Sequence, residues 1–457
     1  MSGRARYENE NPKPVSNTSL IHARKGKSKM VKVEGSSSNK SKRMGTFTLA
    51  LSVVAAFVAP GLSYGAKPPP PLQSLTALNA TVCKGLYGTW TSTTTTCAIS
   101  VPSALTFSIR VPSGVTLDIK STTSDSGQSD GSLTIPTGMT LANAGTIIVE
   151  NAGGVPTEFD ADIYKAGILV LGTLDNSGAI TIQNVADNTE GITISVTATE
   201  NPNDPSVPDP YTVVGGTLAN SGTITIQNQA NTRGIKNLGA LVNSASGTIK
   251  VQNSLTTSVG IYNRRDNHLN PGYYYVDGTM TNAGSIQISN SGKNVNGQFG
   301  YGIYNGGLIT IAATGTFAIN ASSGTPETDD AGGFYNSGSF TNYGTLINNR
   351  GNLTDPQAQV GSFNNEGTMI NYGTTYAGSE NAPCTGIFVN WEGGSIMVNL
   401  GKIINWGGLG DISSSTTMIN HGTIYNYGGI SGGKNRGVCI DEYLVNPSAG
   451  DCYSSGD

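Results

Sequence analysis

A thirteen-residue motif that recurs along the chain is the feature that most restricts how this sequence can fold. Residues 172–184 (GTLDNSGAITIQN) and 216–228 (GTLANSGTITIQN) are identical at eleven of thirteen positions, and residues 278–290 repeat them with conservative changes. Repetition of this kind is typical of proteins built from stacked copies of one small unit. We therefore expect one long repetitive domain, although 457 residues would suffice for two or three.

Alternation of apolar and polar residues within the motif predicts short β-strands. Its core unit is Gly-x-apolar-x-Asn-x-Gly-x-apolar-x-apolar, so alternate side chains point to the same side. The chain is expected to turn at the Asn-x-Gly step, because Gly and Asn adopt the left-handed region most readily. One short strand cannot bury its apolar side alone, so coils must stack about 4.8 Å apart. The predicted fold is all-β, a parallel β-helix or β-solenoid in which stacked Asn side chains form a hydrogen-bonded ladder.

Further copies of the motif define the length of one coil. Shorter copies begin at Gly338 and Gly361, and a companion motif of Gly, an apolar residue, Tyr and Asn occupies residues 260–263, 302–305 and 333–336. Successive copies lie 23 to 44 residues apart. The shorter intervals indicate a coil of about 20–25 residues, and the longer ones indicate inserted loops. No segment after residue 66 has the apolar period of a helix.

Loops inserted between coils are the first place to look for function. We expect them at residues 201–210, 264–275 and 325–331. The second contains the residues of a candidate binding loop, which are Arg264, Arg265, Tyr273, Tyr274 and Tyr275. The three tyrosines would suit a sugar-binding platform, whereas the plainer interpretation is a surface loop with ordinary salt bridges.

Aromatic residues follow the repeat Asn at several positions and predict a stacked row along one edge. These residues are Tyr343, Tyr372, Trp391, Trp406 and Tyr427. Such a row either stacks between coils for stability or forms a binding strip for glycans or another subunit.

The positions of the five cysteines predict a local disulfide near each end of the solenoid. Cys83 and Cys97 lie close together, as do Cys439 and Cys452, and in an exported protein each spacing favours a local disulfide. Solenoid ends expose unpaired strands, so disulfides there would protect them. Cys384 is left over, as either a buried free thiol or an intermolecular link.

Residues 1–65 have the features of a leader with a secretory signal peptide. They contain 11 Lys or Arg against 3 Asp or Glu, and end in an apolar run over residues 46–59 followed by small residues. The run is shorter than the roughly 20 residues that span a membrane. We expect cleavage near Gly65, with an uncleaved anchor or a pilin-type signal as alternatives, and a start at either Met1 or Met30.

The rest of the chain divides into four predicted regions and carries a negative charge. The regions are a Pro-rich spacer (66–74), an N-terminal cap (75–110), the solenoid (111–430) and a C-terminal disulfide cap (431–457). Beyond residue 65 the chain has 15 Lys or Arg against 27 Asp or Glu. This balance argues against a nucleic-acid partner, which needs a basic surface. Sequons at Asn79, Asn320 and Asn352 are possible glycosylation sites if the host has the machinery.

Motifs of the form Gly-Thr-Leu-x-Asn-x-Gly-Thr-Ile alternating with Gly-Ile-Tyr-Asn resemble the parallel β-helix passenger regions of autotransporters and filamentous-haemagglutinin-type adhesins, over residues 105–430. The residues after 430 do not have the many alternating strands of an outer-membrane barrel. The resemblance implies an extracellular structural or adhesive protein, secreted or at the cell surface, of which a self-assembling fibre or sheath subunit is one form. Its expected partners are further copies of itself or cell-surface glycans.

Some parallel β-helices act on polysaccharides, so a lyase or hydrolase is the alternative function. Such enzymes need paired carboxylates, or a base beside bound calcium. Acidic pairs such as Asp125 with Asp130 are more typical of solvated loops. The sequence therefore predicts no catalytic residue, no metal and no cofactor.

Overall fold

The structure is a computed structural model of the chain, which divides into two compact units, residues 1–69 and 70–457. It describes residues 75–101, 103–120, 131–150, 165–185, 189–200, 211–228, 233–253, 259–266, 276–290, 301–321, 333–350, 363–378, 388–390, 394–406, 409–411, 417–426, 438–441 and 444–445, all in the second unit. The leader, signal peptide and spacer predicted for residues 1–74 lie outside this part of the chain.

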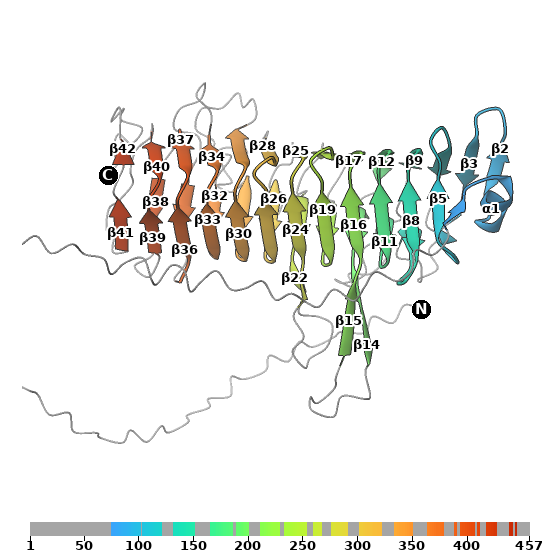
Figure 1. The fold of residues 1–457 in the computed structure, drawn as a ribbon, viewed down its shortest axis with the longest axis horizontal. Helices are drawn as coiled ribbons and strands as arrows, with labels where there is room; N and C mark the ends of the chain where they lie inside the picture. The colour runs from blue at the N-terminus through green and yellow to red at the C-terminus, as the bar shows by residue number, and fades with distance from the viewer. Residues whose placement is uncertain are drawn as a thin grey trace, which may run out of the picture. The chain divides into compact units, whose positions relative to one another are not determined.

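The second unit is a stack of short parallel strands in three long sheets, here named A, B and C (Figure 1). Sheet A pairs, in order, β1 (Thr76–Ala77), β5 (Ile109–Val111), β8 (Thr140–Asn143), β11 (Thr173–Asn176), β16 (Thr217–Asn220), β19 (Ala240–Asn243), β24 (Thr279–Asn282), β27 (Leu308–Ile311), β30 (Ser339–Asn342), β33 (Thr368–Asn371), β36 (Ile396–Asn399), β39 (Thr417–Asn420) and β41 (Val438–Asp441).

Sheet B pairs β2 (Thr89–Thr91), β3 (Thr96–Ile99), β6 (Thr116–Ile119), β9 (Thr146–Glu150), β12 (Ala179–Val185), β17 (Thr223–Asn228), β20 (Thr248–Asn253), β25 (Ser285–Asn290), β28 (Thr316–Ala321), β31 (Thr345–Arg350), β34 (Thr374–Ala377), β37 (Lys402–Asn405), β40 (Thr423–Asn426) and β42 (Leu444–Val445). Sheet C pairs β4 (Ser103–Ala104), β7 (Gly131–Ile135), β10 (Lys165–Val170), β13 (Thr189–Ile194), β18 (Arg233–Asn237), β21 (Val259–Asn263), β26 (Ile303–Asn305), β29 (Phe334–Asn336), β32 (Phe363–Asn365), β35 (Phe388–Asn390) and β38 (Leu409–Asp411).

Each full coil passes through sheet C, then sheet A, then sheet B. Neighbouring coils are in register, so that Leu218 pairs with Leu241 in sheet A and Ile224 pairs with Ile249 in sheet B. Apart from β2, which runs antiparallel to β3, the strands within these three sheets pair in parallel. The prediction of an all-β parallel solenoid is confirmed.

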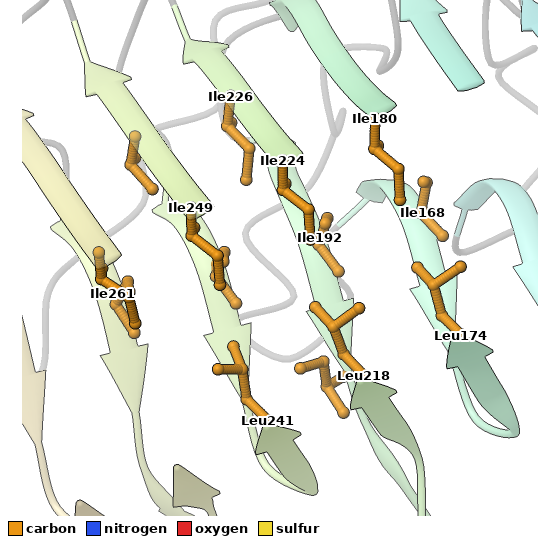
Figure 2. Packing of buried hydrophobic residues seen from close by; sticks show 14 of the residues in the cluster. Ile168, Leu174, Ile180, Ile192, Leu218, Ile224, Ile226, Leu241, Ile249 and Ile261 are labelled. Carbon is orange, nitrogen blue, oxygen red and sulfur yellow. The ribbon is translucent and has the colours of Figure 1, made fainter. Parts of the chain in front are cut away.

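Columns of apolar side chains from the three sheets meet inside the stack and form one continuous core (Figure 2). Ile192, Leu218 and Ile224 come from sheets C, A and B of one coil and are fully buried. Burying one such side chain contributes about 1.5–3 kcal/mol, a gain that no isolated coil obtains. Stacking is therefore what makes each coil stable.

Two buried columns of asparagine run along the core, one at each of two corners. At the corner from sheet A to sheet B, side-chain amides are hydrogen-bonded at 2.7–2.9 Å along Asn143, Asn176, Asn220, Asn243 and Asn282, and again along Asn342, Asn371, Asn399 and Asn420. Ile311 stands at the break between the two runs. At the corner from sheet C to sheet A, Asn237, Asn263, Asn305, Asn336 and Asn365 are linked at 2.7 Å. The predicted asparagine ladder is confirmed, and the solenoid has two such ladders, one at each of these corners.

The two corners explain one error in reading the repeat. The copy that begins at Gly361 was expected to be equivalent to the one at Gly338, but Phe363–Asn365 is β32 of sheet C and pairs with β29. It is therefore a copy of the companion motif. The residues alone do not distinguish the two motifs, because both corners use the same Asn-x-Gly turn.

The glycine of the companion motif has a steric reason. A Cβ at Gly260 would lie 2.4 Å from Cγ2 of Ile288, which reaches across the core from sheet B, and 2.6 Å from the carbonyl oxygen of Gly302 in the next coil. In the same way, a Cβ at Gly302 would lie 2.3 Å from Cγ2 of Ile319. Sheets B and C thus approach so closely at this position that only glycine fits.

A short helix and a disulfide cover the N-terminal end of the described stack. The helix α1 (Ala80–Gly85) lies in a segment where the sequence shows no apolar period of a helix. Six residues are too few to show an apolar period, and the cue is the capping residue Asn79, whose Oδ1 accepts hydrogen bonds from the backbone N–H groups of Thr81 and Val82. The predicted disulfide between Cys83 and Cys97 is confirmed and joins α1 to β3.

Two antiparallel hairpins interrupt the corner from sheet C to sheet A. One pairs β14 (Val196–Glu200) with β15 (Tyr211–Gly215), and the other pairs β22 (Arg265–Asp266) with β23 (Val276–Asp277). The predicted loop 201–210 lies between β14 and β15 in the sequence and outside the described residues. The predicted loop 264–275 includes β22 of the second hairpin, and its residues 267–275 lie outside the described part of the chain. The loop 325–331 lies outside the described residues.

Candidate binding face

A row of stacked tyrosines crosses the outer surface of sheet C. Tyr262, Tyr304 and Tyr335 pair in register on consecutive coils, and their ring centroids lie 4.9 and 4.8 Å apart. Tyr301 flanks the row, with its ring 6.0 Å from Tyr304 and 5.3 Å from Tyr335. All four are half-buried. Because the rings stack on each other, their faces are largely covered by neighbouring rings.

Three cationic side chains lie at the N-terminal end of this row. The guanidinium of Arg233 is 4.2 Å from the ring centroid of Tyr262, and that of Arg264 is 5.9 Å from it. Lys236 precedes Tyr262 in the same column. We call these four tyrosines and three cations the tyrosine face.

A buried carboxylate holds two of the cations in place. Glu190 is only 2% exposed, and its Oε1 lies 3.0 Å from the Arg233 guanidinium and 3.8 Å from the Lys236 ammonium. Its other oxygen accepts a hydrogen bond from the Thr193 hydroxyl. A carboxylate is buried at tolerable cost only when paired in this way, so Glu190 fixes the cations and is not exposed to a ligand.

The opposite end of the tyrosine face is anchored by Glu366. The hydroxyl of Tyr335 donates a hydrogen bond to its carboxylate. Burial, and then this hydrogen bond, raises the pKa of the Tyr335 phenol above its ordinary value of about 10. The phenol therefore remains a neutral hydrogen-bond donor at physiological pH.

The predicted binding loop coincides with the tyrosine face at one residue. Arg264 belongs to the face, and Arg265 begins β22, with its backbone paired to Asp277. Tyr273, Tyr274 and Tyr275 lie outside the described residues. Three tyrosines of the face, Tyr262, Tyr304 and Tyr335, are the third residue of the companion motif, whereas Tyr301 lies just before it, and nothing in the sequence indicates that the four stack.

The predicted row of stacked aromatics after the repeat Asn is confirmed for Tyr343 and Tyr372 but wrong for Trp406. Tyr343 and Tyr372 follow strands of sheet A and stack at 4.8 Å with an interplanar angle of 8°. Trp406 instead follows β37 of sheet B, and the strand before Trp391 is β35 of sheet C. The same Asn context therefore occurs at more than one corner, with Tyr343 and Tyr372 at one and Trp406 at another. Trp391 and Tyr427 themselves lie outside the described residues.

The other predicted site residues are distributed as follows. Asn79 is exposed at the start of α1, and Asn320 is half-buried in β28. Cys439 belongs to β41, of which only the backbone is described. Cys452, Cys384 and Asn352 lie outside the described residues, so the second disulfide, the possible intermolecular thiol and the third sequon stay predictions.

The tyrosine face has the chemistry of a recognition surface. Tyrosine and arginine dominate the energetically important positions of binding surfaces, because each combines apolar area with directional hydrogen bonding. Within the described part of the chain, no group of three or more His, Cys, Asp or Glu is placed to hold a metal ion. Over the same residues, no helix is long and apolar enough to cross a membrane.

Comparison with known proteins finds no matching family model, no matching curated protein and no matching solved structure. The class that the fold itself defines is the parallel β-solenoid.

Proposed function

We propose that this protein is an extracellular structural or adhesive surface protein whose solenoid presents the tyrosine face to cell-surface glycans. The observation that carries the proposal is the face itself, in which phenol groups recur on three consecutive coils, with fixed cations beside the first of them. A repeating row of hydrogen-bonding groups suits a ligand that is also a repeating chain of hydroxyl groups. The resemblance of the motifs to autotransporter and haemagglutinin passenger regions supports export and adhesion.

The alternative of a polysaccharide-active enzyme would need an accessible carboxylate beside a base. Among the described residues, Glu190 is the carboxylate with both Arg and Lys close by, and it is 2% exposed. Its burial favours a structural role for this ion-paired group and leaves adhesion as the better-supported proposal.

Binding of the full-length exported chain to immobilised glycans tests the proposal. The variant Tyr262→Ala with Tyr304→Ala removes two neighbouring rings of the face, and we expect its affinity to fall by about tenfold or more. The matched control is Tyr376→Ala with Tyr425→Ala, which removes two half-buried tyrosines from the outer surface of sheet B. Equal loss in both variants, or glycan binding by neither the parent nor the variants, would refute the proposal.

A further inference from the structure

The outer surface of sheet A is uncharged over seven consecutive strands. No Lys, Arg, Asp or Glu occurs in β16, β19, β24, β27, β30, β33 or β36. The outward residues of these strands are Thr, Ser, Ala, Val, Leu and Ile. A surface with about 25–35% charged residues favours solubility, and this chain has only 12% charged residues, none of which lies in these seven strands.

Exposed apolar side chains also concentrate on this side of the solenoid. Ten large hydrophobic residues are exposed in the described part of the chain, and six of them lie on sheet A or directly after one of its strands. These six are Val242, Leu308, Tyr343, Tyr372, Ile396 and Leu400, each 36–48% exposed. We call the outer surface of the seven strands, with these six residues, the apolar face. Seven of the fourteen outward residues in these strands are Thr or Ser, so the exposed apolar side chains lie among small uncharged polar ones. Exposed apolar side chains gathered on one side of a soluble protein mark a candidate interaction site.

Only short turns border the apolar face at the corner from sheet A to sheet B. Where sheet A passes into sheet B, the turns between described strands have only two to four residues, such as Tyr343-Gly344 and Ser244–Gly247. Both hairpins instead emerge from the corner between sheets C and A, at the other edge of the apolar face, directly before β16 and β24. A second sheet can therefore approach from the side of Tyr343 and Tyr372, where the turns are short.

We infer that the apolar face binds the apolar face of a second copy of this chain, in a two-fold symmetric pair with sheet A packed on sheet A. A two-fold contact brings each patch against itself, so a patch with net charge would repel its own copy. The chain beyond residue 65 has 27 Asp or Glu against 15 Lys or Arg, which makes an uncharged face the favourable place for self-contact. Flat sheets pack face to face about 10 Å apart through interdigitating apolar side chains.

The size of the face predicts a weak, concentration-dependent pair. Six inter-strand spacings and four-residue strands with their turn residues give a face of about 29 Å by about 18 Å. Two copies would bury about 1,000 Å² in total, which is the lower limit for a specific protein interface. The inference stands on this face alone and does not depend on glycan binding by the tyrosine face.

Sedimentation velocity of the purified full-length chain over a wide concentration range tests this inference. We expect the parent to shift from monomer to dimer, and Leu308→Lys with Ile396→Lys to raise the dissociation constant by about tenfold or more, because like charges then face each other. The matched control, Thr223→Lys with Gln227→Lys, adds the same charge at exposed positions of sheet B and should dimerise like the parent. Non-reducing gels of the same samples separate this contact from a disulfide link through Cys384.

A second measurement does not depend on folding of the lysine variant. A photo-crosslinking amino acid at Tyr372 should give covalent dimers, and the same group at Thr223 should give none. A parent that stays monomeric throughout, a lysine variant that folds and dimerises like the parent, or crosslinks that form equally at both positions would overturn the inference.

Discussion

Removing one rung of an asparagine ladder should destabilise the coils around it. The side chain of Asn305 is fully buried and makes four hydrogen bonds. Its Nδ2 donates to Oδ1 of Asn336 at 2.7 Å and to the carbonyl of Ser339 at 3.1 Å, while its Oδ1 accepts from Nδ2 of Asn263 at 2.7 Å and from the N–H of Gly307 at 3.2 Å. At about 1 kcal/mol net for each bond, Asn305→Ala should cost about 4 kcal/mol.

The loss should be local, because each coil contacts mainly its neighbours. Native-state hydrogen exchange of the full-length chain is therefore the suitable assay, since it measures the opening free energy of each segment separately. We expect the largest decrease in peptides that cover β26, β29 and their partners in sheet A.

The control for this prediction is Asn364→Ala. Asn364 lies on the same sheet but points outward, in register with Tyr335, and is half-buried. Its loss should change the opening free energy by about 0.5 kcal/mol or less. If Asn305→Ala costs no more than Asn364→Ala, the ladder does not stabilise the stack and the reasoning fails.

Three further predictions concern the core, the N-terminal end and the tyrosine face. Gly260→Ala should destabilise its coil by about 1–3 kcal/mol through overpacking, whereas Gly85→Ala, where a Cβ meets nothing within 4 Å, should be neutral in urea unfolding. Cys83→Ser should lower stability at the N-terminal end by about 3 kcal/mol, because the disulfide to Cys97 closes a loop with a sequence separation of 14. Limited proteolysis should then cleave the N-terminal end faster in the variant, and an unchanged cleavage rate would contradict the prediction. The raised pKa of Tyr335 means that its phenol contributes stability that is fully present below the unfolded pKa of about 10 and is lost as pH rises further. The stability difference between the parent and Tyr335→Phe should therefore be constant from neutral pH to about 10 and shrink above it, and a difference that grows there would contradict the assignment.

The architecture could be predicted from the sequence because two features of the repeat, its apolar alternation and its Asn-x-Gly step, both indicate it. Alternation placed Leu218 and Ile224 in the core, and the Asn-x-Gly step placed Asn220 in a ladder; both are confirmed. These features are local, since they depend on strand periodicity and turn chemistry within about ten residues.

The positions that sequence reasoning missed depend on register between coils. Intervals of 23 to 44 residues between copies hide which residues lie above one another. Tyr262 and Tyr304 are 42 residues apart yet stack, while Trp406 shares the Asn context of Tyr372 and lies at another corner. Ile311 also shows that one rung can be apolar, because Asn282 donates instead to the carbonyl of Thr316 at 2.9 Å.

Surface labelling of intact cells tests the central claim, an exported solenoid that acts outside the cell, most directly. An antibody against the solenoid should label unpermeabilised cells or recover the protein from the medium, and the recovered chain should lack the predicted signal peptide. Detection only after the cells are permeabilised, with residues 1–65 still attached, would contradict the claim of an extracellular role.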